Sequence, residues 1–71
     1  MTFVLLHDRN GDGVLVDFAH ILYACKEKYG SHAVTELYTL SGKDEVTLYV
    51  TETPEEIYKL ICKAVGIYEC T

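Results

Sequence analysis

The sequence predicts an α+β fold, in which an antiparallel sheet of four to five strands carries one C-terminal helix packed on one of its faces. Residues 45–51 alternate between apolar positions and glutamate, threonine or tyrosine, which is the period of a strand with one buried face. The residues that follow carry helix-capping signals and then apolar side chains at helical spacing. Near the start of the chain, two apolar runs flank Asn-Gly and Asp-Gly, which is a strong hairpin signal.

The C-terminal helix is expected to span Pro54–Val65. Thr53 supplies an N-cap hydroxyl, Pro54 occupies the first helical position, and Glu56 stands at N3, where its carboxylate can return a bond to the cap backbone. Gly66 is placed for a C-terminal cap. The helix face expected to pack on the sheet and the first hairpin consists of Ile57, Leu60, Ile61 and Val65, opposite Val46, Leu48 and Val50.

Two hairpins are expected before the helix. Phe3–Leu6 is continuously apolar, which is typical of a buried strand, and Asp8–Gly13 forms a turn before a second run, Val14–Val16. Serine, glycine and lysine at 41–43 mark another turn, which separates the alternating run 33–40 from the strand that precedes the helix.

Residues 17–30 fit two structures. In the first, Asp17 is the N-cap of a helix over 18–29 whose apolar face contains Phe18, Ile21, Leu22 and Cys25. In the second, Asp17 starts a tight turn into a strand with one side formed by Ile21, Tyr23 and Cys25. Periodicity alone slightly favours the helix.

Size and charge narrow the class of protein. The 71 residues are 49% hydrophobic and 24% charged, which fits a folded single domain, 1–71, and argues against disorder. A chain this small buries only about 60% of its unfolded surface, so we expect a second copy to help stabilise it, as a homodimer. The formal charge of −5 repels phosphate backbones and argues against a nucleic-acid partner.

The cysteines and the hydropathy profile indicate the cellular compartment of the protein. Cys25, Cys62 and Cys70 show no CxxC spacing, and the opening residues lack the basic region of a signal peptide. No apolar run approaches the roughly 20 residues of a membrane span. We therefore expect reduced thiols in a cytoplasmic protein without a membrane segment.

The turn at Asp8–Gly13 resembles the beginning of an EF-hand calcium loop. Asp8, Asn10 and Asp12 stand at the first three ligand positions, followed by the required glycine. Position twelve, which needs a bidentate carboxylate, is Ala19. We interpret the segment as a glycine-rich hairpin turn and keep a weak cation site at Asp8, Asn10 and Asp12 as the alternative.

Other residues with catalytic potential have structural explanations. His7, His20 and His32 are scattered, and none has a cysteine or a second histidine at metal-ligand spacing. Glu55 and Glu56 are explained by the helix N-terminus, where the dipole favours negative charge. We therefore predict that the protein is not an enzyme and has no cofactor.

The tyrosines show the most suggestive pattern. Tyr49 lies opposite the Val46–Leu48–Val50 side of its strand, so it points away from the helix. Tyr23 and Tyr38 join it if the strands pair in register. An exposed sheet face with three tyrosines would be an interface for a partner or a second copy, although cross-strand aromatic pairing without a partner explains the pattern equally well.

In order, these pieces resemble the small FlbD-like proteins of flagellar operons and phage genomes, whose final strand runs into the motif V-x-E-[ST]-x-E-E-[IV]. The matching segments cover about residues 3–61: Asn10-Gly11, Val14–Asp17, His20-Ile21, Leu40–Gly42 and Tyr49–Ile57. This chain has extra residues in the Asp8–Gly13 turn and a longer segment at 21–33. The resemblance favours the strand over the helix for the segment after Asp17, with Tyr29-Gly30-Ser31 as a hairpin turn, and we predict this strand. The family has no catalytic residues to transfer.

Three functional hypotheses follow. The first is a small acidic binding protein that acts by protein contact on a basic surface; the phage origin implied by the resemblance makes it an inhibitor of a host system, of the anti-defence type. The second, by family analogy, is a regulator of transcription or flagellar assembly. The third is a calcium-responsive module built on Asp8–Asp12.

Overall fold

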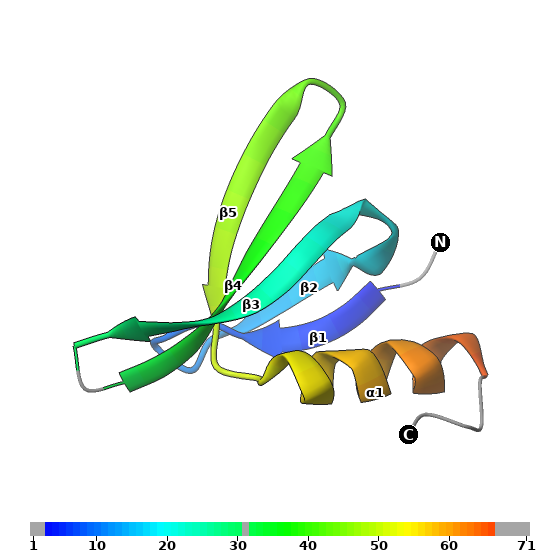
Figure 1. The fold of residues 1–71 in the computed structure, drawn as a ribbon. Helices are drawn as coiled ribbons and strands as arrows, with labels where there is room; N and C mark the ends of the chain where they lie inside the picture. The colour runs from blue at the N-terminus through cyan, green and yellow to red at the C-terminus, as the bar shows by residue number, and fades with distance from the viewer. Residues whose placement is uncertain (1–2, 31, 67–71) are drawn as a thin grey trace.

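The computed structural model describes residues 3–30 and 32–66, and it confirms the α+β class (Figure 1). The elements are, in order, β1 (Phe3–His7), β2 (Gly13–Asp17), a 3-10 turn η1 (Phe18–His20), β3 (Ile21–Tyr29), β4 (His32–Ser41), β5 (Asp44–Val50) and α1 (Pro54–Val65). The prediction of one sheet of four to five strands is corrected. β1 and β2 form an antiparallel two-stranded sheet, and β3, β4 and β5 form an antiparallel three-stranded sheet.

The sheets separate because the chain turns sharply between β2 and β3. The Asp17 carboxylate accepts a hydrogen bond from the Ala19 backbone N–H at 3.1 Å and so caps η1. After this turn β3 pairs with β4 instead of β2. Among the described residues, one isolated antiparallel bridge, between Asp8 and Val50, links the two sheets.

The 18–29 segment is a 3-10 turn followed by a strand, so the strand prediction is confirmed and the alternative of an α-helix is wrong. A bulge lies near the start of β3, where Ile21 pairs with Thr39 but Tyr23 pairs with Tyr38. The extra residue shifts the alternation by one position. Ile21 therefore packs against the core while Tyr23 is exposed, and the prediction that Ile21 shares a side with Tyr23 is wrong.

Both predicted hairpins are present. In the first, the Asp8 carboxylate accepts bonds from the backbone N–H groups of Asn10 and Asp12, and Gly11 takes a positive φ of 87°. In the second, Ser41 pairs with Asp44 across a tight turn that places Gly42 at φ 63°. The composition of each turn thus follows from backbone geometry.

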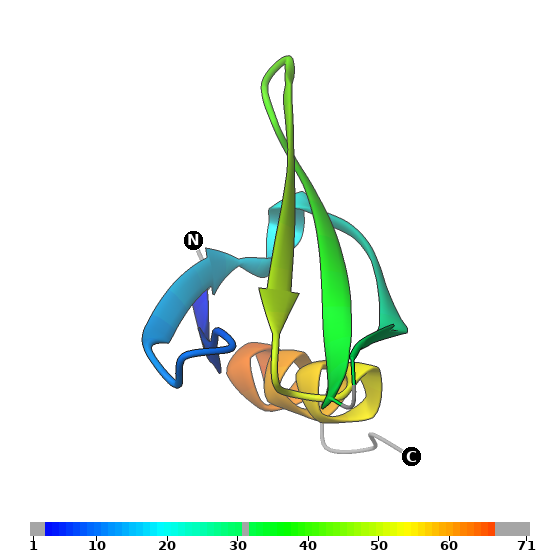
Figure 2. The same cartoon turned by 90° about the vertical axis from the view of Figure 1, so that its left-hand side faces the viewer.

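The core forms where the two sheets and the helix meet (Figure 2). Its buried members come from both sheets and from α1: Val4, Leu6, Val16, Leu37, Val50 and Ile57. Leu48, Leu60 and Ile61 pack against it, as expected. Phe3 and Leu5 are exposed, so the prediction of a fully buried first strand is wrong; only one face of β1 is buried.

Two residues assigned to the helix–sheet contact lie outside it. Val46 and Val65 are both exposed. The distal half of the β4–β5 hairpin rises away from the helix, and Val65 is in the last turn of α1 (Figure 1). The contact between α1 and β5 is thus shorter than the apolar spacing in the helix and the strand predicts.

The ends of α1 confirm the predicted caps. The Glu56 backbone N–H donates to the Thr53 hydroxyl, and the Thr53 N–H donates to the Glu56 carboxylate, both at 3.1 Å. Gly66 adopts the left-handed conformation, and its N–H bonds to the carbonyls of the last turn. α1 has twelve residues, and the described part of the chain holds no helix with the length and hydropathy to cross a bilayer.

The cysteines differ in state. Cys25 carries a free thiol, as expected. Cys62, buried on α1, takes part in a disulfide bond, so the prediction that its thiol is reduced is wrong. Cys70 lies outside the described residues.

We expect Leu37→Ala to lower the free energy of unfolding by about 2–5 kcal/mol, because Leu37 is 0% exposed and its truncation leaves a cavity among both sheets and the helix. Leu22→Ala, at the 57% exposed bulge position, is the matched control and should change stability by less than about 0.5 kcal/mol. Urea unfolding followed by circular dichroism measures both. Equal losses would show that the core is not centred on Leu37.

Candidate partner-binding face

The three-stranded sheet has one side in the core and one side away from it. Leu37 and Val50 point inward, so their neighbours along β4 and β5 point outward. We name the outward side the outer face; its defining side chains are Tyr23, Cys25 and Glu27 on β3, Glu36 and Tyr38 on β4, and Glu45, Thr47 and Tyr49 on β5. The strand register thus places all three tyrosines predicted to bind a partner on one surface.

Tyr23 and Tyr38 form a stacked pair at the centre of this face. Their ring centroids are 5.2 Å apart, and the ring planes differ by 2°. The Tyr38 hydroxyl donates a hydrogen bond to the Glu45 carboxylate, which raises the pKa of Tyr38. Partial desolvation, together with the charge of Glu36, raises the pKa of Tyr23. Both phenols are therefore neutral at physiological pH.

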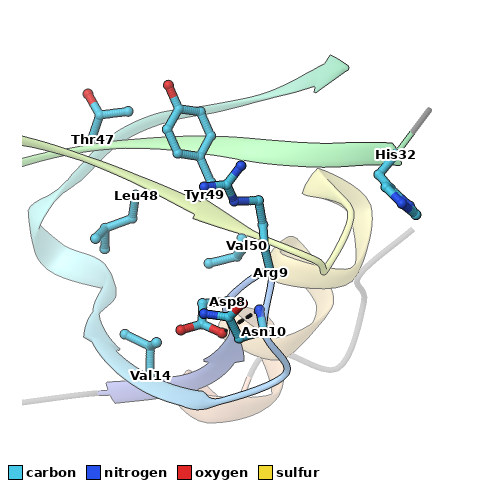
Figure 3. Close-up of a pocket in the computed structure, with 9 residues that line it drawn as sticks. All are labelled: Asp8, Arg9, Asn10, Val14, His32, Thr47, Leu48, Tyr49 and Val50. Atoms are coloured by element: carbon cyan, nitrogen blue, oxygen red, sulfur yellow. Dashed lines mark hydrogen bonds between the residues drawn. The ribbon is translucent and has the colours of Figure 1, made fainter. Parts of the chain in front are cut away.

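Tyr49 holds an arginine on the same face. The Arg9 guanidinium carbon lies 5.8 Å from the centre of the Tyr49 ring, a cation–π distance (Figure 3). Arg9 comes from the β1–β2 turn, and Tyr49 pairs across the strands with Glu36. The contact therefore connects the first hairpin to the outer face.

Cys25, Glu27 and Glu36 form a cluster that sequence reasoning missed. Their sulfur and carboxylate atoms lie within 4.8 Å of one another. Partial desolvation and the charges of Glu36 and Glu27 raise the pKa of the Cys25 thiol, which disfavours the thiolate that a nucleophile or metal ligand needs. The cluster offers one thiol and two carboxylates to a metal, but without imidazole or further thiolates it does not match a usual zinc set. The cluster forms because Cys25 pairs with Glu36 across β3 and β4, and this pairing cannot be read from the sequence alone.

The residues of the predicted calcium site lie in the turn between β1 and β2, and the flanking elements are strands instead of the helices of an EF-hand. Asp8 Oδ1 accepts two backbone N–H bonds, at 2.9 and 3.0 Å, so a structural role explains this aspartate. Asp8 and Asn10 also border a hollow of about 560 Å³ that reaches Tyr49 and Val50 on β5 (Figure 3). Cation binding by Asp8, Asn10 and Asp12 stays a prediction.

His7 and Glu52 fasten the first sheet to the loop before α1. The Glu52 carboxylate accepts from the His7 backbone N–H at 2.9 Å, and its other oxygen lies 2.6 Å from His7 Nδ1. The His7 carbonyl accepts from the Thr51 N–H at 2.8 Å. The buried Thr35 hydroxyl donates to the Glu52 carbonyl. Two of the three histidines are thus structural, since His20 Nδ1 also lies 3.0 Å from the Leu40 carbonyl oxygen.

A second surface lies on the outside of the β1–β2 sheet. Leu5 and Leu15 face each other across the strands, and Phe3 lies diagonal to Leu15. All three side chains are exposed. We name them the apolar patch. A contiguous group of large apolar side chains on a surface is typical of an interaction site.

Comparison of the chain with protein-family models, with curated proteins and with solved structures gives no match. The resemblance to FlbD-like proteins therefore stays a prediction that rests on the motifs given above.

The Glu52 carboxylate gives a prediction about pH. Partial burial alone would raise the pKa of Glu52, but the hydrogen bonds from the His7 ring and backbone outweigh it, and the pKa is lowered. A lowered folded-state pKa adds stability that is present above the unfolded value, near 4.5, and is lost as the pH falls through the folded value. Glu52→Gln should cost about 1–3 kcal/mol at neutral pH, since it removes a charge-assisted bond.

The test is urea unfolding of the wild type and Glu52→Gln from neutral pH downward. The difference between them should be constant at neutral pH and shrink as the pH falls below the unfolded value. Asp44→Asn, at the exposed start of β5, removes the same charge away from the helix end and should show no such pH-dependent loss. A difference that stays constant down to pH 3 would contradict the proposed role of the carboxylate.

Proposed function

We propose that this protein is a small acidic, non-enzymatic binding protein that acts by contact, and that its outer face docks on a basic surface of a protein partner. The observation that carries the proposal is the gathering of Tyr23, Tyr38 and Tyr49 with three glutamates on one side of a sheet. Aromatic side chains supply much of the binding energy in protein interfaces.

The charge of the outer face supports a basic partner. Within the described residues, neither Glu27 nor Glu36 forms an ion pair. Lys26 and Lys28 alternate with the outward residues of β3, so they point to the opposite side of the sheet. The outer face is therefore acidic in its own right, which attracts basic protein surfaces and repels phosphate.

Two observations support a non-enzymatic role. The raised pKa of Cys25 disfavours its thiolate form, and its neighbours are glutamates instead of a histidine base. His7 and His20 are engaged in hydrogen bonds that hold loops and strands together.

The biological setting follows from the resemblance. A phage-type origin makes an inhibitor of a host system, of the anti-defence type, the leading proposal, because an acidic tyrosine-bearing face can compete for a basic channel or groove. A regulator of transcription or flagellar assembly is the alternative by family analogy.

We also propose a homodimer formed through the apolar patch. Phe3, Leu5 and Leu15 carry no charge, so two copies can meet there without repulsion. Two outer faces would instead bring together three glutamates from each copy. A second copy would cover apolar area that a chain of this size leaves exposed.

Binding through the outer face is tested with two tyrosines of equal exposure. Tyr23, on the outer face, is 49% exposed, and Tyr58, on α1, is 51% exposed. Proteins captured by the wild type are purified and titrated by calorimetry. Tyr23→Ser should weaken the affinity by about tenfold or more, the loss expected for a central interface aromatic, and Tyr58→Ser should leave it unchanged. Equal effects of the two substitutions, or none, would refute outer-face docking.

The dimer is tested by sedimentation equilibrium. Leu15→Asp places a charge in the centre of the apolar patch and should convert the dimer to monomer, because each copy would bury an unpaired carboxylate. Leu22→Asp, at an exposed position of the β3 bulge, is the control and should leave the dimer intact. A monomeric wild type would exclude the proposed dimer.

A further inference from the structure

The outer face offers two kinds of group side by side: an aromatic plane and carboxylates that have no ion-pair partner within the described residues. Tyr23 stacks on Tyr38 through one side of its ring and is half exposed. Glu36 and Glu27 lie beside it, and their charges act on both Tyr23 and Cys25. A ligand that contacts this part of the face meets a flat ring and negative charge together.

A guanidinium group matches that combination. It is planar, it stacks on aromatic rings, and its N–H donors point outward from its edge, where carboxylates can accept them. The carboxylate oxygens of Glu27 and Glu36 lie within 4.8 Å of each other, a span that the edge of one guanidinium can bridge. An ammonium group offers the same charge without the flat surface.

The chain already contains such a contact. Arg9 lies over Tyr49, at the β5 side of the same face. Tyr49 pairs with Glu36, so the ring that holds Arg9 and the carboxylate beside Tyr23 are cross-strand neighbours. One tyrosine of the outer face, Tyr49, therefore already contacts a guanidinium, that of Arg9 from the same chain.

We propose that the outer face recognises an arginine side chain of its protein partner, with the guanidinium stacked on Tyr23 and hydrogen-bonded to Glu27 and Glu36. This inference rests on the proposed function and names the chemistry of the partner. Charge complementarity selects a cationic segment, and the aromatic plane selects arginine over lysine.

A second copy of the chain cannot fill this role. Arg9 is the only arginine in the sequence, and it already lies over Tyr49. Two outer faces would also bring like charges together. The occupant is therefore a different protein with an arginine-rich segment.

The test is a titration of the ¹⁵N-labelled protein followed by NMR, with an oligoarginine and an oligolysine peptide of equal length as probes. We expect the largest amide shifts at 23–27 and 36–38, and an affinity for oligoarginine at least about fivefold higher, because lysine lacks the stacking contact.

Two variants locate the site. Glu36→Gln should weaken oligoarginine binding by about tenfold, as expected for the loss of one charge-assisted hydrogen bond. Glu55→Gln makes the same change in net charge on α1 and should leave the affinity nearly unchanged. The amide spectra of the free variants show whether each is folded.

The outcomes separate this inference from the proposed function. Equal affinity for the two peptides, with shifts at the outer face, overturns arginine recognition and leaves outer-face docking in place. Equal weakening by Glu36→Gln and Glu55→Gln shows a general charge effect and also overturns it. Absence of binding at the outer face by either peptide overturns both.

Discussion

The structure depends on the junction at which the two-stranded sheet is fastened to the rest of the chain. At this junction the Glu52 carboxylate accepts from both the backbone and the ring of His7, while the His7 carbonyl accepts from Thr51. The bridge between Asp8 and Val50 lies directly beside it. Since β1 and β5 belong to different sheets, these polar contacts fix the angle at which the sheets approach, and the apolar side chains fill the space that results. Partly buried polar groups can have this role when each of them is satisfied.

The same junction places the candidate site. It holds the end of β5 against the β1–β2 turn, which brings Arg9 over Tyr49. It also orients the loop from which α1 begins, because Thr35 anchors the Glu52 carbonyl directly before the Thr53 cap. The helix then closes the core beneath both sheets (Figure 2), and the side of β3–β4–β5 that carries the three tyrosines faces away from that core. An exposed outer face is thus a consequence of how the core is closed.

Features set by neighbouring residues were predictable from sequence, and features set by pairing between distant residues were not. The Thr53–Glu56 capping box and the Gly66 cap depend on local geometry, and both are confirmed. The division into two sheets and the bulge beside Leu22 depend on which strands pair and in what register. For the same reason the outward direction of Tyr49 could be predicted from alternation within one strand, whereas the Cys25–Glu27–Glu36 cluster could not.

Charge and hydrophobicity are divided between two surfaces, and this division constrains how the molecule can work. The three glutamates and three tyrosines of β3, β4 and β5 lie on the outer face, while the exposed Phe3, Leu5 and Leu15 lie on the other sheet. A surface that is apolar and uncharged can meet a copy of itself, but an acidic surface cannot do so without repulsion. If the apolar patch forms the dimer, a two-fold arrangement leaves both outer faces free. A symmetric dimer of this kind would present two acidic, aromatic surfaces to one basic partner, and joining two weak contacts in this way raises the overall affinity without adding any new contact within either site.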